Sequence, residues 1–125
     1  MTPGKKARLN RLNRLIIKRM GYRYVTLNRH PSLSPRAWID SKGYTVRESK
    51  LPVPTESWDN FRKAVDVILG PEYIITTIKR EGRGFYVTFG RSDVLMIEDT
   101  DWAETPELAG CLALEKYLEE EKNVR

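Results

Sequence analysis

The chain has 125 residues, of which 40% are hydrophobic and 31% charged, values typical of one globular domain. No apolar run approaches the roughly 20 residues that a membrane-spanning helix needs. We therefore expect a single domain over residues 1–125, with frayed ends at 1–5 and 120–125. The N-terminal stretch is interrupted by Arg and Lys, so we expect no secretory signal and a cytoplasmic location.

Charge is distributed unevenly along the chain, although the net charge is only +5. Residues 1–50 contain 13 Lys and Arg against 2 acidic residues, a balance of +11, whereas residues 51–125 contain 9 against 15, a balance of −6. The first 29 residues carry nine positive charges and no acid. Such asymmetry indicates an acidic partner for the basic end, either nucleic acid or an acidic protein surface.

The basic end begins with a predicted amphipathic helix from about Lys6 to Met20. At 100° per residue its apolar positions share one side, namely Leu9, Leu12, Leu15, Ile16 and Met20. The opposite side carries a row of basic residues: Arg11, Arg14 and Lys18. Gly21 is a typical helix stop. We expect the apolar side of this helix to dock on the rest of the domain.

Short extended segments follow the helix. The alternation over residues 22–27 predicts a strand, and two prolines mark residues 28–35 as a loop. The segments 38–39 and 44–46 flank the turn-rich sequence DSKG, which predicts a small hairpin. A proline-punctuated linker over residues 47–54 leads into the second half of the chain.

A second helix is predicted from Trp58 to Leu69, where apolar residues form one continuous face. Thr55 or Ser57 can cap its N-terminus, because a side-chain oxygen there accepts a hydrogen bond from an otherwise unpaired backbone N–H. The following Gly-Pro sequence ends the helix.

Three strands and a last helix complete the chain. The strands are predicted at residues 73–79, 85–89 and 94–97, and the short turns between them make an antiparallel meander. The last helix opens with Thr-Pro-Glu at residues 105–107, a sequence suited to a cap and a first turn.

The strand at residues 94–97 (VLMI) is apolar on both faces, whereas a strand covered on one face alternates. We therefore predict an α+β fold in which two layers of helix cover an antiparallel sheet, a three-layer α/β/α sandwich. Its core order is helix, three-strand meander, helix, and the basic helix and the small hairpin precede it.

Several short sequences along the chain resemble one known family. They are Met20-Gly21-Tyr22, Trp38-Ile39-Asp40, Pro54-Thr55 before Trp58, and the run TPELAGCLAL at residues 105–114. Over roughly residues 10–120 the chain resembles the phage ABA sandwich domain, a family of small proteins of bacteriophages and prophages. The resemblance implies the α/β/α sandwich and a phage origin, which would place the protein in the bacterial cytoplasm. It implies no activity and no functional residues.

The residues show no arrangement that predicts catalysis, a metal or a cofactor. His30, the single histidine, lies in a loop without a recognisable nucleophile, and Cys111, the single cysteine, lies on an apolar helix stripe as a buried side chain does. The acidic residues over 98–104 lack the alternating ligands of a calcium loop. We expect a protein that is not an enzyme and that holds no cofactor and no metal.

The basic helix is the leading candidate for partner binding. The site residues that we predict are Arg8, Arg11, Arg14, Lys18, Arg19, Tyr22 and Tyr24, the two tyrosines being the nearest aromatic complement. Asn10 and Asn13 could add hydrogen bonds to phosphates. Three interpretations stay open: a solvated face or one paired with the chain's own acidic half, a nucleic-acid interface, and an interface for an acidic protein.

Our first hypothesis for function is a small bacteriophage accessory protein that binds and modulates a host protein, such as a component of a defence system. It depends on the small size of the chain, on its resemblance to the phage family and on the lack of a recognisable catalytic site. The alternative is a nucleic-acid-binding accessory protein that uses the basic helix. We expect no membrane contact, and no feature of the sequence selects a homo-oligomer.

Overall fold

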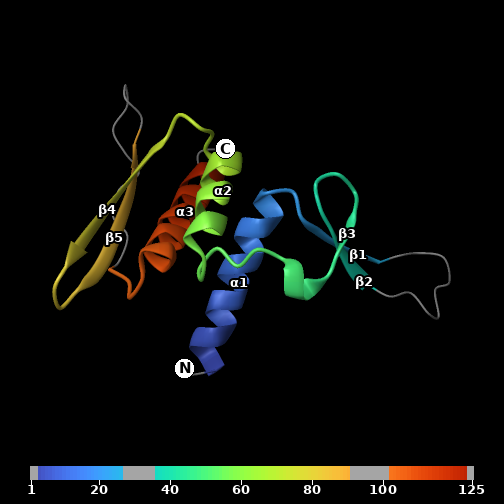
Figure 1. Ribbon diagram of the computed structural model, residues 1–125, viewed down its shortest axis with the longest axis horizontal. Helices are drawn as coiled ribbons and strands as arrows, with labels where there is room; N and C mark the ends of the chain where they lie inside the picture. The colour runs from blue at the N-terminus through green and yellow to red at the C-terminus, as the bar shows by residue number, and fades with distance from the viewer. Residues whose placement is uncertain (1–2, 27–35, 91–101, 124–125) are drawn as a thin grey trace.

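The computed structural model describes residues 3–26, 36–90 and 102–123, with side chains up to residue 119 in the last helix. Within these residues the chain forms an α+β fold of three α-helices, one 3-10 turn and two small antiparallel sheets (Figure 1). The elements in chain order are α1 (Pro3–Arg19), β1 (Arg23–Thr26), β2 (Arg36–Ile39), β3 (Thr45–Val46), the 3-10 turn η1 (Glu48–Lys50), α2 (Trp58–Ile68), β4 (Ile74–Arg80), β5 (Gly84–Gly90) and α3 (Pro106–Asn123).

The first sheet has the order β1-β2-β3 and contains the predicted hairpin. Its turn is closed by Asp40, whose carboxylate oxygen Oδ1 accepts hydrogen bonds at 2.9 Å from the backbone N–H groups of Lys42 and Tyr44. An Asp side chain at the start of a turn forms this arrangement readily, which is why the sequence DSKG predicts the turn correctly.

The second sheet is the antiparallel pair β4–β5, which matches two strands of the predicted meander. Ala103 adds one further bridge, because its N–H and carbonyl exchange hydrogen bonds of 2.9 and 2.7 Å with Phe85. Gly84 has a φ of +97°, and its backbone lies against the Ala103 carbonyl, where an added Cβ has no room. The third predicted strand, residues 94–97, lies outside the described residues.

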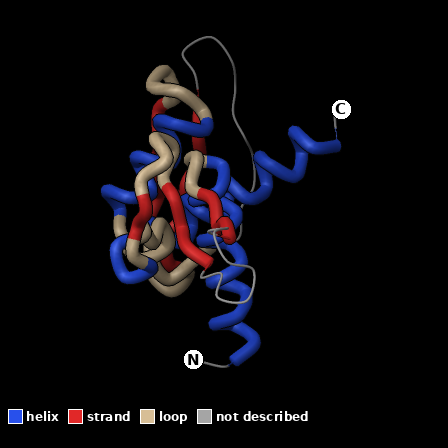
Figure 2. The backbone as a smooth tube through the Cα atoms, turned by 90° about the vertical axis from the view of Figure 1, so that its right-hand side faces the viewer, coloured by secondary structure: helices blue, strands red, loops and turns tan. Residues whose placement is uncertain are grey.

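The helices pack in a group on one side of the β4–β5 sheet. α3 lies directly on β5, and α1 and α2 both pack on α3 and on each other (Figure 1). Figure 2, turned by 90°, shows the N-terminal turns of α1 and the C-terminal turns of α3 extending away from the rest of the chain. The core lies between the sheet and the three helices, and its largest fully buried side chains include Leu12, Ile16, Phe61, Phe89 and Leu114.

A close approach of α2 and α3 occurs at Gly110. The ring of Phe61 fills the space that a Cβ at this position would need, so the absence of a side chain lets the two helices come together. The Phe61 ring is itself held between Trp58 and Phe89, at centroid distances of 5.2 and 6.0 Å. The small residues of the 105–114 run therefore have a packing role.

The caps of α2 and α3 form as predicted. The Ser57 hydroxyl accepts a hydrogen bond of 3.3 Å from the N–H of Asn60, so Ser57 and not Thr55 caps α2. The Thr105 hydroxyl accepts one of 3.2 Å from the N–H of Leu108 at the start of α3.

Both outer helices are longer than the sequence predicts. α1 begins at Pro3 instead of near Lys6, because proline needs no hydrogen bond at the first helical position. α3 continues to Asn123, so the chain is helical at 3–5 and at 120–123, where we expected fraying.

The prediction for the apolar side of α1 is wrong at one position. Leu15 is 37% exposed, whereas Ile17, which we left off that side, is 3% exposed. The reason is that α1 packs against both α3 and α2, which shifts its buried arc from Leu15 toward Ile17.

The α+β class is confirmed, and the three-layer sandwich stays a prediction. In the described part of the chain, no helix covers the face of the β4–β5 sheet away from α3; Trp102 packs on Tyr86 there, and Ile74 and Ile78 are 59% and 42% exposed. The structure does not describe residues 91–101, which follow β5. The strand at 94–97, from whose pattern the third layer was predicted, lies among them.

Candidate partner-binding surface

The N-terminal helix α1 carries the candidate surface on the side away from the core. Leu12, Ile16 and Ile17 are buried, which confirms that the helix docks on the domain through its apolar side. We call Arg11, Arg14 and Lys18 the basic row; all three are exposed. Because the helix that carries the row is anchored in the core, the three side chains project from one side of a fixed backbone.

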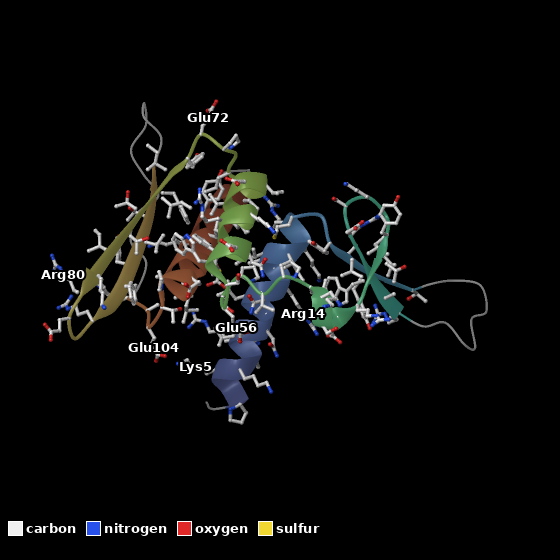
Figure 3. All side chains as sticks on the ribbon, viewed as in Figure 1. Lys5, Arg14, Glu56, Glu72, Arg80 and Glu104 are labelled. Carbon is white, nitrogen blue, oxygen red and sulfur yellow. The ribbon has the colours of Figure 1, made fainter. Side chains whose placement is uncertain are left out.

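The basic row makes no ion pair with any residue that the structure describes. Two ion pairs link the acidic half of the chain to the flank of α1. There Lys5 Nζ lies 3.4 Å from Glu104 Oε1, and Arg8 Nη2 lies 3.9 Å from Glu115 Oε1. Figure 3 shows Arg14 on the side of α1 away from Lys5. Of the predicted site residues, Arg8 thus pairs with an acidic residue of the chain itself. Within the described segments, the basic row stays exposed to solvent.

Asn13 has a structural role, so its predicted contact with phosphates is wrong. Its Nδ2 donates a hydrogen bond of 2.8 Å to the Thr55 hydroxyl, and its Oδ1 accepts one of 3.1 Å from the Thr55 backbone N–H. Thr55 is only 8% exposed. The reciprocal pair fixes the segment before α2 against α1 and occupies the Asn13 amide. Asn10, in contrast, is exposed.

The predicted aromatic complement divides into two residues with different surroundings. Tyr24 is 44% exposed and packs on Trp38 with ring centroids 5.2 Å apart. Tyr22 is half-buried, and its N–H bonds the Ile17 carbonyl at the end of α1. Tyr24 is therefore the more exposed of the two tyrosines. Arg19, also exposed, lies in the last turn of α1.

The structure adds one cation that the sequence analysis did not select. The Arg36 guanidinium lies over the Tyr24 ring, 4.8 Å from its centroid. The cause is the register of β1 and β2, which pairs Tyr24 with Trp38 and Thr26 with Arg36 on one face of the sheet. Only the pairing register, which no local pattern reveals, brings residue 36 to residue 24.

A groove about 310 Å³ in volume forms the second notable surface. Its apolar floor is made by leucines of α1 and α3, namely Leu9, Leu12, Leu108 and Leu112. Its rim carries Lys5, Arg8 and Glu104, and Arg83 from the β4–β5 turn. Trp102 forms one wall, packed on Tyr86 at 5.4 Å and with the Arg80 guanidinium 5.8 Å from its ring centroid. In sequence these segments are far apart, so the groove was not predicted.

Cys111 is fully buried, as predicted, and burial together with the nearby Glu107 carboxylate raises the pKa of its thiol. A thiol in this state is a poor nucleophile. No three His, Cys, Asp or Glu residues gather as a metal site within the ranges described. His30 and residues 98–101 of the acidic loop lie outside those ranges.

None of the helices in the described ranges is long and apolar enough to cross a lipid bilayer. Comparison of the chain with protein-family models, curated proteins and solved structures finds no match in any of the three.

Proposed function

We propose that this chain is a non-enzymatic nucleic-acid-binding protein that contacts phosphates through the basic row of α1. The observation that carries the proposal is the exposure of Arg11, Arg14 and Lys18 on one side of a docked helix, without an ion pair to any described residue. Seven residues of α-helix separate the ends of the row by about 10 Å, a length over which duplex DNA carries about six phosphate charges.

The proposed binding depends on charge and is independent of base sequence. Arg and Lys contacts to phosphates release condensed counterions, so affinity falls as salt rises. Three contacts to duplex DNA give a slope of log K against log salt of about −2.7, which is a loss of about 40-fold between 50 and 200 mM salt. Arg36, whose guanidinium lies over the exposed Tyr24 ring, adds one further cation on the strands that follow the same helix.

The test compares two variants that have the same net charge. In the first, Arg11, Arg14 and Lys18 are changed to Glu; in the second, three exposed cations elsewhere are changed to Glu, namely Lys42, Arg62 and Lys63. Each change takes the formal net charge from +5 to −1, because each Lys or Arg to Glu substitution removes two charges. Only the position of the charges then differs.

Affinity for a labelled DNA duplex is measured by fluorescence polarisation over a range of salt concentrations. We expect the basic-row variant to lose affinity and to show a salt slope smaller by about 2.7, with the control variant close to the original protein. The proposal fails if the basic-row variant binds as tightly, and with the same slope, as the control.

The second candidate function is modulation of a host protein by a bacteriophage accessory protein. The phage origin depends on the sequence resemblance, and the three-layer sandwich depends on that resemblance and on the strand at residues 94–97, which is apolar on both faces. The observation that favours a protein partner is the groove between α1 and α3, because an apolar floor is of little use for contacts with phosphate. A pull-down from bacterial lysate with and without nuclease separates the candidates: a nucleic-acid binder loses its captured proteins after nuclease treatment, whereas a protein modulator keeps one.

A further inference from the structure

The groove between α1 and α3 combines an apolar floor with positive charges on two opposite sides. Lys5 and Arg8 lie on α1 along one side, and Arg83 lies on the β4–β5 turn along the other. Among the described residues that line the groove, Glu104 is the single acidic one. The hairpin tip and the N-terminal half of α1 both flank the start of α3 in Figure 1.

The two-sided rim restricts the chemistry of a ligand. A ligand with one anionic group at one end, such as a fatty acid, would satisfy one side of the rim only. A ligand that suits both sides carries acidic groups before and after an apolar group. A peptide segment with this acid–apolar–acid pattern has its charges spaced along an extended backbone and its large side chain between them.

From this arrangement we infer that the α1–α3 groove is a docking site for an acidic peptide segment of a partner protein, with one large apolar side chain on the leucine floor. The carboxylates of the segment lie against Lys5 and Arg8 on one side and against Arg83 on the other. The volume of about 310 Å³ suits a single large anchor and no extended apolar surface. This site is distinct from the basic row, which faces away from the groove.

Carboxylates of the chain itself already occupy two of these cations. Glu104 reaches Lys5 at 3.4 Å and Glu115 reaches Arg8 at 3.9 Å, and three of these four side chains are at least 47% exposed. Exposed ion pairs of this kind are weak, so an incoming carboxylate exchanges with them at little cost. The contact of Lys5 with Glu104, which also lines the groove, shows that a carboxylate at the groove can reach this cation.

Trp102 provides a rigid wall for the apolar anchor. Its ring packs on Tyr86 and under the Arg80 guanidinium, which project from the sheet face away from α3, so the position of this residue is set before a ligand arrives. A prearranged wall reduces the ordering that binding requires.

The experiment uses the full chain and three synthetic, fluorescein-labelled peptides. The first has a central Phe with two Glu on each side, the second has Ala in place of Phe, and the third has Gln in place of every Glu. Binding is measured by fluorescence polarisation with the original protein and with Arg83→Glu, Arg8→Glu and Arg14→Glu. Arg14 is the matched control, because it is an exposed arginine of α1 on the side away from the groove.

We expect the acidic Phe peptide to bind the original protein and its Arg14→Glu variant equally. Arg83→Glu and Arg8→Glu should each weaken binding by about tenfold, and the Ala and Gln peptides should bind at least about 30-fold more weakly. Arg83 lies in an exposed turn, so its substitution leaves the fold intact, and circular dichroism verifies this for each variant.

Three results of the peptide titrations would each overturn the inference. They are no binding of the Phe peptide at millimolar concentration, equal binding of the Phe and Ala peptides, and an equal loss in the Arg14→Glu variant. The last two indicate attraction by net charge alone. A competition experiment with unlabelled duplex DNA adds one more test. If the DNA removes the peptide from the original protein but not from the Arg14→Glu variant, peptide and DNA share one surface, and the inference of a separate groove site is also overturned.

Discussion

Substitution of Gly110 by Ala tests the contact between α2 and α3 most directly. An added Cβ would lie 2.6 and 2.7 Å from Cε1 and Cε2 of the Phe61 ring, and against its Cζ. Carbon atoms in contact are normally about 3.5 Å apart, so the ring or the helix must move by more than about 1 Å to clear Cζ, the closest ring atom. Phe61 is 0% exposed and is held by Trp58 and Phe89, so neither movement is easy.

The magnitude follows from two opposed effects. Overpacking of a well-filled core costs about 1–3 kcal/mol, whereas replacement of Gly by Ala inside a helix gains about 1 kcal/mol. The overlap with the Phe61 ring is large, so the overpacking cost lies near the upper end, at about 2–3 kcal/mol. After the gain of about 1 kcal/mol, we expect the free energy of unfolding to fall by about 1–2 kcal/mol and the melting temperature by about 4–8 °C. Urea denaturation followed by circular dichroism measures the first quantity, and a thermal melt measures the second.

Gly4→Ala is the matched control for this substitution. Gly4 lies in α1 with no atom within 4 Å of an added Cβ, so the same chemical change meets open space. We expect it to be neutral or to stabilise by less than about 1 kcal/mol. Combination of Gly110→Ala with Phe61→Leu, which shortens the obstructing ring, should reduce the loss by at least about 0.5 kcal/mol relative to the sum of the single changes. A Gly110→Ala variant as stable as the original protein would refute the packing argument.

Two further substitutions test buried polar groups. Asn13→Ala leaves the backbone N–H and the hydroxyl of Thr55, a residue that is 8% exposed, without their hydrogen-bond partner. We expect the free energy of unfolding, measured by urea denaturation, to fall by about 1–3 kcal/mol. The control Asn10→Ala, on the exposed side of α1, should change it by no more than about 0.5 kcal/mol. Because burial raises the pKa of the Cys111 thiol, the folded state holds this proton more tightly than the unfolded state, and stability falls as pH rises above the ordinary thiol pKa. With an unfolded thiol pKa of about 8.5, the free energy of unfolding falls by about 1.4 kcal/mol from this cause between about pH 7.5 and 9.5. A Cys111→Ala variant that keeps the full pH dependence of stability would contradict this explanation.

The local elements of this chain can be read from sequence, because their causes are local. Helix α1 follows from apolar residues at helical spacing, and α2 follows from its Ser57 cap and its Gly-Pro ending. The turn after β2 follows from the side chain of Asp40. The exposed basic row follows from the same periodicity, since residues opposite the apolar side of a docked helix face solvent.

The arrangement between elements depends on contacts that no short pattern contains. Whether Leu15 or Ile17 of α1 is buried depends on which two helices meet α1, and the local periodicity is compatible with either choice. The role of Gly110 depends on the Phe61 ring, which lies on another helix.

The sequence by itself determined the candidate surface on α1: an amphipathic helix with Arg11, Arg14 and Lys18 on its outer side. Only the tertiary structure decided that Asn13 is engaged with Thr55 and that the groove exists. The groove requires residues from α1, α3 and the β4–β5 turn at one place, and their sequence separation is too large for any local pattern to show it. The physical reason is that helix periodicity is set by backbone geometry, whereas the sides of different elements meet only where the whole core packs.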